Sequence, residues 1–257
     1  MERYHNYQKL VKQQLKGHFL FLYGWMMLGS FLITILQKVP LFMPLDSLAL
    51  IATVVTSMLY FFINVTLCFL FIQNIRGITF RKEDIRYSFS KFGNEILFGF
   101  VVSFFQACVN MFVLFLVNIP LLYLIVTIFV NLFFLSWFSY AAYMIYDQKV
   151  TLTELIKQPV HALRTNASTV LLAGGFYVLW NVICQVVLSY ILNPFLSQYG
   201  SLDQVMVELM KNGGSHMDVL LSVSVVMLVF ILVQYAILVV YNTYLANIYE
   251  SEQDLLK

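Results

Sequence analysis

The chain has 257 residues, of which 61% are hydrophobic and only 11% are charged, with a mean hydropathy of +0.82. A soluble domain is about 45–50% apolar and about 25% charged, so this composition cannot cover a water-facing surface. It predicts an all-α, polytopic membrane protein that forms one integral membrane domain over residues 1–257. Because every predicted tail and loop is short, a soluble catalytic or nucleic-acid-binding domain is excluded, and a net charge of +2 does not favour a nucleic-acid partner.

Long stretches without charged side chains locate the membrane spans. They run from Asp46 to Arg76, from Glu95 to Asp147, from Arg164 to Asp203 and from Asp218 to Glu250. A span needs about 20 residues, so the second stretch holds two spans, and the second of them begins at Pro120, because proline is tolerated in the first turn of a helix. The first apolar segment is interpreted as a retained signal anchor. The sequence therefore predicts six spans, and the fifth is expected to end near Asn193–Pro194. The spans are at about 18–37, 48–73, 96–117, 120–146, 168–192 and 218–248.

The basic residues divide between alternate connections of these spans. Of the 15 Lys and Arg residues, 13 lie in the two tails and in the connections after the second and fourth spans, and the exceptions are Lys38 and Lys211. Cytoplasmic connections are enriched in Lys and Arg. The sequence therefore predicts a multi-pass protein of the cell membrane with both termini in the cytoplasm.

A short amphipathic helix is expected between the fourth and fifth spans. Thr151 and Glu154 have the spacing of a capping box, and Ile156, Val160 and Leu163 then recur at one helical face. Pro159 falls inside this segment and is a candidate helix breaker.

The same pattern precedes two other pairs of spans. Ile85, Phe89 and Phe92 follow Thr79, and Val11 and Leu15 precede the first span. The chain is thus interpreted as three repeats beginning near 7, 79 and 151, each an amphipathic helix followed by a two-span hairpin. The helices are expected to lie on anionic lipid or to dock a cytoplasmic partner such as an ATPase subunit, through a basic interface of Arg81, Lys82, Arg86, Lys91, Lys157 and Arg164.

The predicted spans lack the residues that intramembrane chemistry requires. No Asp, Glu, Lys or Arg lies inside a span, which argues against proton relays and ion-coupling sites, and no catalytic motif is present. Cys68, Cys108 and Cys184 show no metal-ligand spacing and are expected to be buried thiols. We therefore expect a non-enzymatic protein without cofactor or metal.

Neutral polar residues form rows on two spans. Gly99, Ser103 and Ala107 repeat every four residues on the third span, and Gly174 and Gly175 precede a similar row on the fifth. Small residues permit close helix packing and amides hydrogen-bond between helices; a groove for a headgroup or another amphipathic ligand is the alternative. The residues that either role would use are Gln106, Asn110, Asn181, Gln185 and Ser189, with the last three expected to face the third span.

Tyrosines gather at the predicted cytoplasmic ends of the fourth and sixth spans. Such residues commonly anchor a helix at the lipid headgroups, and an aromatic-lined substrate path is the alternative. The residues concerned are Tyr140, Tyr143, Tyr146, Tyr241, Tyr244 and Tyr249.

The stretch from Pro120 to Gly175 resembles a known group. Its segment SWFSYAAYMIYDQKVTLTELIKQPVHALRTNASTVLLAGG joins an Ala/Tyr-rich span end, a short basic helix and an Arg164-Thr165-Asn166 entry to the next span. In this it is similar to the YciC-like bacterial six-span membrane proteins and to the membrane region of some glycerophosphodiester phosphodiesterases. The segment FSKFGNEILFGFVVSFF is similar to YesL-like membrane proteins. These resemblances imply a bacterial six-span fold and transfer no catalytic residue.

Two classes of function stay open from the sequence. The first is a non-enzymatic scaffold, accessory or lipid-interacting membrane protein, which could also form a homo-oligomer. The second is the permease-like subunit of a small ABC-type transporter or of a peptide export or immunity system. An ATPase encoded in the neighbouring reading frame would favour the second.

Overall fold

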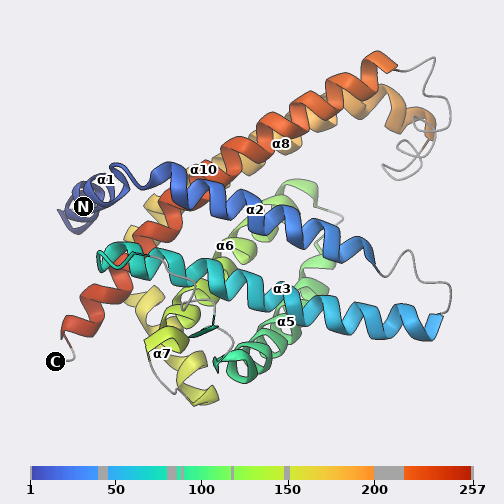
Figure 1. Cartoon of the computed structure of the whole chain (residues 1–257). Helices are drawn as coiled ribbons and strands as arrows, with labels where there is room; N and C mark the ends of the chain where they lie inside the picture. The colour runs from blue at the N-terminus through green and yellow to red at the C-terminus, as the bar shows by residue number, and fades with distance from the viewer. Residues whose placement is uncertain are drawn as a thin grey trace. The chain divides into compact units, whose positions relative to one another are not determined.

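The computed structural model describes residues 2–39, 46–79, 86–87, 90–116, 119–147, 151–199 and 217–255, and within these ranges the fold is all helical (Figure 1). Long apolar runs explain why most of these helices are longer than an average helix of a soluble protein. The helices are α1 (Glu2–Leu15), α2 (Phe19–Lys38), α3 (Asp46–Ile75), α5 (Phe92–Leu114), α6 (Pro120–Asp147), α7 (Leu152–Thr165), α8 (Ala167–Tyr199) and α10 (Met217–Leu255).

Five of the described helices contain a segment long and apolar enough to cross a membrane. These segments are Phe19–Lys38, Ile51–Ile75, Ile125–Asp147, Ala167–Cys184 and Val225–Gln253. Helix α5, at the place of the expected third span, contributes a shorter apolar stretch, Leu97–Val113. The apolar helices thus indicate a membrane-embedded, multi-pass protein.

Two helices continue through a proline that was expected to interrupt or end them. Helix α8 passes Pro194 and ends at Tyr199. Helix α7 contains Pro159, whose missing N–H would have bonded the carbonyl of Leu155 four residues earlier. The indole Nε1 of Trp137 donates a 3.1 Å hydrogen bond to that carbonyl instead. The prediction of a break at Pro159 is therefore wrong, because α6 satisfies the acceptor that proline leaves unpaired.

The chain forms two compact units, which are described separately. The larger comprises Met1–Gly174 and Val239–Lys257. Within it α3 packs against α2, α5 and α6, and α6 also packs against α5 and α7. The smaller unit is Gly175–Leu238, where α8 and α10 lie side by side and Trp180 Nε1 donates to the carbonyl of Phe230 at 3.1 Å.

Glycines allow close helix packing at three crossings of the larger unit. A Cβ added at Gly29 would lie 2.6 Å from Leu67, one at Gly99 would lie 2.4 Å from the ring of Phe61, and one at Gly174 would lie 2.8 Å from Leu132. Of the predicted small-residue row on α5, Gly99 is buried, whereas Ser103 and Ala107 are exposed. Only the first member of that row therefore acts as expected within the described part of the helix.

The tyrosines at the ends of α6 and α10 are buried in the larger unit. Tyr140, Tyr143, Tyr241, Tyr244 and Tyr249 are each at most 5% exposed. Tyr140 and Tyr143 both pack their rings against Tyr249. The expectation of anchors facing lipid headgroups is wrong for these five residues, because the other helices of the unit cover them.

Candidate functional site

A cluster of charged side chains joins the ends of α3, α6 and α10. Arg76 donates two hydrogen bonds to Asp147 and a third to Glu250. The hydroxyl of Tyr249 donates to Asp147 at 2.8 Å, and the guanidinium of Arg76 also lies over the ring of Tyr146. Its hydrogen bonds to Asp147 raise the pKa of Arg76 further above its usual value. We call Arg76, Asp147, Tyr146, Tyr249 and Glu250 the polar cap.

Helix α1 is attached beside the polar cap. The side-chain amides of Gln14 and Asn247 form a reciprocal pair, with donor–acceptor distances of 3.0 and 2.7 Å. Tyr7 shares a 2.6 Å hydrogen bond with Ser251. An amphipathic helix at the start of the chain is thus bound to α10 through polar contacts, which fixes it at this end of the unit.

Hydroxyl and amide groups pair in the buried layer next to the cap. Ser139 on α6 donates to the side-chain oxygen of Asn242 on α10 at 2.9 Å. Tyr143 donates to the backbone carbonyl of Asn242 at 3.1 Å, and Ser136 shares a hydrogen bond with Tyr241. Amides in apolar surroundings are stable only when paired, so this layer holds α6 against α10 and fixes their register.

Helix α7 is an amphipathic helix that lies against α6. Its capping box is confirmed: the Thr151 hydroxyl accepts from the backbone N–H of Glu154, whose carboxylate accepts from the N–H of Thr151 at 2.9 Å. These bonds to the Thr151 backbone and hydroxyl lower the pKa of Glu154.

The buried face of α7 differs from the predicted face. Leu155, Pro159, Ala162 and Leu163 are buried, whereas Val160 is 41% exposed. The predicted Ile156–Val160–Leu163 face is therefore correct only at Leu163. The apolar residues left outside, together with exposed Lys157, His161 and Arg164, give α7 an outer side suited to a membrane surface.

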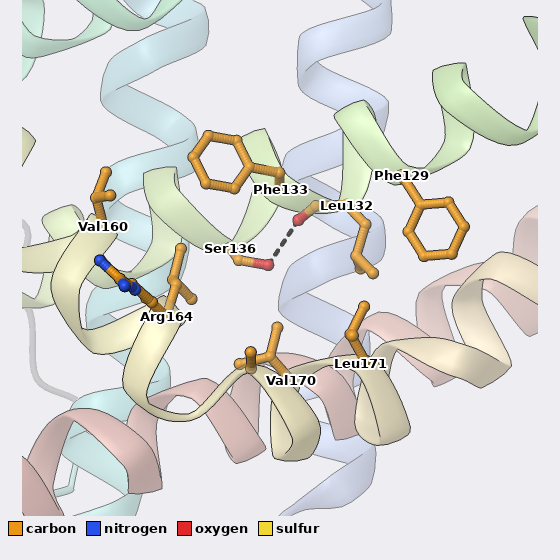
Figure 2. Close-up of a pocket in the computed structure, with 10 residues that line it drawn as sticks. Phe129, Leu132, Phe133, Ser136, Val160, Arg164, Val170 and Leu171 are labelled. Carbon is orange, nitrogen blue, oxygen red and sulfur yellow. Dashed lines mark hydrogen bonds between the residues drawn. The ribbon is translucent and has the colours of Figure 1, made fainter.

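A groove lies between α6 on one side and α7 with the start of α8 on the other (Figure 2). Its volume is about 310 Å³. Figure 2 shows Val160 and Arg164 at one end and Phe129 and Leu171 at the other. We call it the α6–α7–α8 groove; it is lined by Phe129, Leu132, Phe133, Ser136, Val160, Leu163, Arg164, Ala167, Val170 and Leu171.

A second cavity, of about 440 Å³, lies on another side of α7 and is more polar. Glu252 enters it, accepting from Tyr140 at 2.8 Å and from the side-chain amide of Asn166 at 2.6 Å. Both oxygens of the Glu252 carboxylate thus accept hydrogen bonds from neutral donors. The other lining residues are Lys157, Gln158, His161, Thr165 and Gln253.

A third cavity, of about 730 Å³, lies among α2, α3 and α5. Two of its hydroxyls bond the backbone: Thr56 donates to Ala52 and Ser57 donates to Thr53, one turn earlier on the same helix. Gln37, Tyr60 and Ser103 also line it.

Part of the predicted polar row lies in described regions. Gln106 is half-buried. Asn181 is half-buried and donates to the carbonyl of Tyr177 on its own helix at 2.8 Å. The side chains of Asn110, Gln185 and Ser189 lie outside the described residues. The facing of this row toward the third span therefore stays a prediction.

The predicted basic interface divides into three places. Arg86 is exposed, and Lys91 lies over the ring of Tyr87, which bonds the end of α6. Lys157 and Arg164 are exposed on α7 and line different cavities. Arg81 and Lys82 lie outside the described residues, as does most of the second predicted amphipathic helix.

Sequence reasoning missed the polar cap, although its signal was present. Arg76, Asp147 and Glu250 are each the first charged residue after a long uncharged stretch. Opposite charges on the same predicted membrane side can pair, but the prediction used these residues only to bound the spans and to count the basic ones.

Comparisons of the chain with protein-family models, with curated proteins and with solved structures found no match. The resemblance to YciC-like and YesL-like proteins therefore stays a prediction. Function has to be argued from the cap, α7 and the cavities.

Proposed function

We propose that this chain is a non-enzymatic, six-span protein of the bacterial cell membrane, with both termini in the cytoplasm, that interacts with anionic lipid as an accessory or scaffold factor. The proposal takes α5 as a span, the third in chain order, which brings the total to six. The basic residues alternate between membrane sides only with an even number of spans. It takes the polar cap as the cytoplasmic end of the larger unit.

The observation that carries the lipid role is the position of α7. This helix is held by a capping box at its start and packs Leu155, Pro159 and Leu163 inward. It leaves Lys157 and Arg164 exposed next to the partly exposed apolar side chain of Val160. Apolar residues beside basic ones are what a helix at an anionic lipid surface needs, and each basic residue near such a surface contributes about 1 kcal/mol.

The test is the preference of the reconstituted protein for anionic over zwitterionic lipid. In vesicles of phosphatidylglycerol and phosphatidylcholine, spin-labelled lipids report the immobilised fraction of each. We expect charge reversal at two exposed bases, Arg86→Glu with Lys157→Glu, to lower the preference for phosphatidylglycerol, because two attractive contacts become repulsive. Insertion and thermal stability should be retained.

The matched control keeps the charges: Arg86→Lys with Lys157→Arg should preserve the lipid preference. If charge reversal reduces expression but leaves the lipid preference of the surviving protein unchanged, the bases only set topology and the lipid role is wrong.

The exposed polar strip of α7 also supports a second candidate function. Lys157, Gln158, His161 and Arg164 lie on its outer side, where an acidic surface of a cytoplasmic ATPase subunit could dock, as expected for a permease-like subunit. An ATPase gene beside the gene for this chain would favour this alternative, and charge reversal would then abolish binding of that purified subunit rather than lipid preference.

A further inference from the structure

We propose that the α6–α7–α8 groove binds one anionic phospholipid, with an acyl chain along the groove and the phosphate at Arg164. This inference rests on the proposed lipid role and names the lipid class and the site. Three features of the groove support it: its lining, the charge at one end and the place of its two ends along the apolar helices.

The interior of the groove suits hydrocarbon. Apart from Arg164 at its end, Ser136 contributes the one polar side chain among the described lining residues. Its hydroxyl is engaged, because it donates to the carbonyl of Leu132 and shares a hydrogen bond with Tyr241. A ligand inside the groove therefore finds no free polar partner, and a volume of about 310 Å³ is at the small end for ligand sites. It fits one chain rather than a whole lipid.

A single positive charge stands at one end of the groove. Arg164 is exposed, and within the described part of the chain no hydrogen bond or ion pair engages its guanidinium. The neighbouring carboxylate Glu252 is bound by Tyr140 and Asn166 in the adjoining cavity. Guanidinium binds phosphate through two parallel N–H bonds.

The two ends of the groove differ in their place along the apolar helices. Phe129 and Leu171 belong to the apolar segments Ile125–Asp147 and Ala167–Cys184, whereas Arg164 precedes the second segment and lies on α7. The groove thus connects the apolar parts of two helices with a basic residue outside these segments.

The experiment counts lipids retained by the purified full-length protein. Native mass spectrometry in detergent, with phosphatidylglycerol and phosphatidylcholine of equal chain length added in turn, gives apparent affinities for both. We expect one tightly held phosphatidylglycerol. Arg164→Gln should weaken it about tenfold, as expected for loss of one charge-assisted contact. Lys12→Gln, at an exposed base of α1 that does not line the groove, should leave it unchanged.

A second pair of variants tests the acyl position. Ala167 lines the groove and is exposed, and its neighbour Ser168 is exposed but does not line it. Ala167→Trp should remove the bound lipid by filling the groove, whereas Ser168→Trp should not. Circular dichroism melts of both variants verify that the fold is retained.

Four results would overturn the proposal. Equal losses with Arg164→Gln and Lys12→Gln would show diffuse attraction, which leaves the proposed lipid role standing and removes the groove. Retention of phosphatidylglycerol by Ala167→Trp would place the lipid elsewhere. Competition by millimolar inorganic phosphate would identify a free anion site. Retention of a fatty acid without any phospholipid would show that the groove binds a fatty acid and not a phospholipid.

Discussion

Asn242 and Ser139 illustrate how single polar residues act inside an apolar helix bundle. Asn242 is 4% exposed, and its side-chain oxygen accepts from Ser139 on the neighbouring helix. Asn181 instead bonds to its own helix. An amide that pairs between helices contributes to their association, on the order of 0.6–2 kcal/mol, whereas a bond to the preceding turn does not link two helices. Asn242 thus links two helices of the larger unit, and the facing expected for Asn181 stays a prediction.

At Gly99 we expect a single added methyl group to lower the stability of the protein. Its added methyl would meet the ring of Phe61 at 2.4 Å, whereas Gly93 on the same helix has no neighbour within 4 Å of that position. Gly99→Ala should destabilise the protein by about 1–3 kcal/mol through overpacking. Gly93→Ala should stabilise it by up to about 1 kcal/mol through reduced backbone entropy.

Thermal melts of the two glycine variants in one detergent decide between these outcomes. Equal shifts in melting temperature would show that α3 and α5 do not approach each other closely at Gly99.

At the scale of elements, α7 depends on contacts at both its start and its middle. The capping box at Thr151 and Glu154 satisfies the first free backbone N–H groups. The indole of Trp137 on α6 satisfies the carbonyl that Pro159 leaves free. A short helix that contains proline is unstable alone. The capping box, the hydrogen bond from Trp137 and the packing on α6 therefore stabilise α7 together.

The capping box predicts a pH dependence of α7. The folded pKa of Glu154 is lowered by its bonds to Thr151. The box therefore contributes its full stability above the unfolded pKa of about 4.3 and loses it as the pH falls through the lower folded value. Amide hydrogen exchange of residues 152–156 should accelerate across that window, relative to the known pH dependence of intrinsic exchange.

The matched variant is Glu154→Gln, since glutamine keeps a side-chain acceptor but does not titrate. Its α7 should exchange without the acid-dependent step. A step of the same size in this variant would assign the pH dependence to another group.

At the scale of the molecule, the polar cap connects helix ends that are far apart in sequence. Arg76 follows α3, Asp147 ends α6, and Glu250 lies in the last turns of α10. Gln14 and Asn247 add α1 to the same end. Each partly exposed ion pair is weak, but several bonds on one guanidinium give a fixed geometry. The cap therefore sets which helix ends meet, more than it adds to total stability.

The membrane topology is a prediction about the whole molecule, because it fixes the number of spans and the side of each connection. With six spans, a cysteine at Ser90 lies in the cytoplasm and one at Ser197 lies outside, because the basic residues sort by side. In a cysteine-free background, a membrane-impermeant maleimide added to intact cells should label Ser197→Cys and not Ser90→Cys. After lysis both should react. Labelling of both residues from one side would contradict six spans.

Several features could be predicted from the residues alone. The ends of α3 and α6 follow from the uncharged stretches that Arg76 and Asp147 terminate. The cap of α7 follows from Thr151 and Glu154, since both signals are local in sequence. The buried face of α7 was missed at Ile156 and Val160, because two overlapping apolar faces fit the same periodicity, and only the packing on α6 selects one.

The sequence by itself determined that the chain is helical, largely membrane-embedded and built from long stretches without Asp, Glu, Lys or Arg. These properties depend on composition and on order along the chain, which decide solvent and local backbone structure. The tertiary structure alone decided that the tyrosines are buried, that Trp137 compensates Pro159, that Arg76 joins three helix ends, and that Arg164 stands at the end of an apolar groove. Each of these features depends on which helix faces pack together. The sequence alone does not decide this, because one apolar helix face is as compatible with lipid as another until a specific neighbour packs against it.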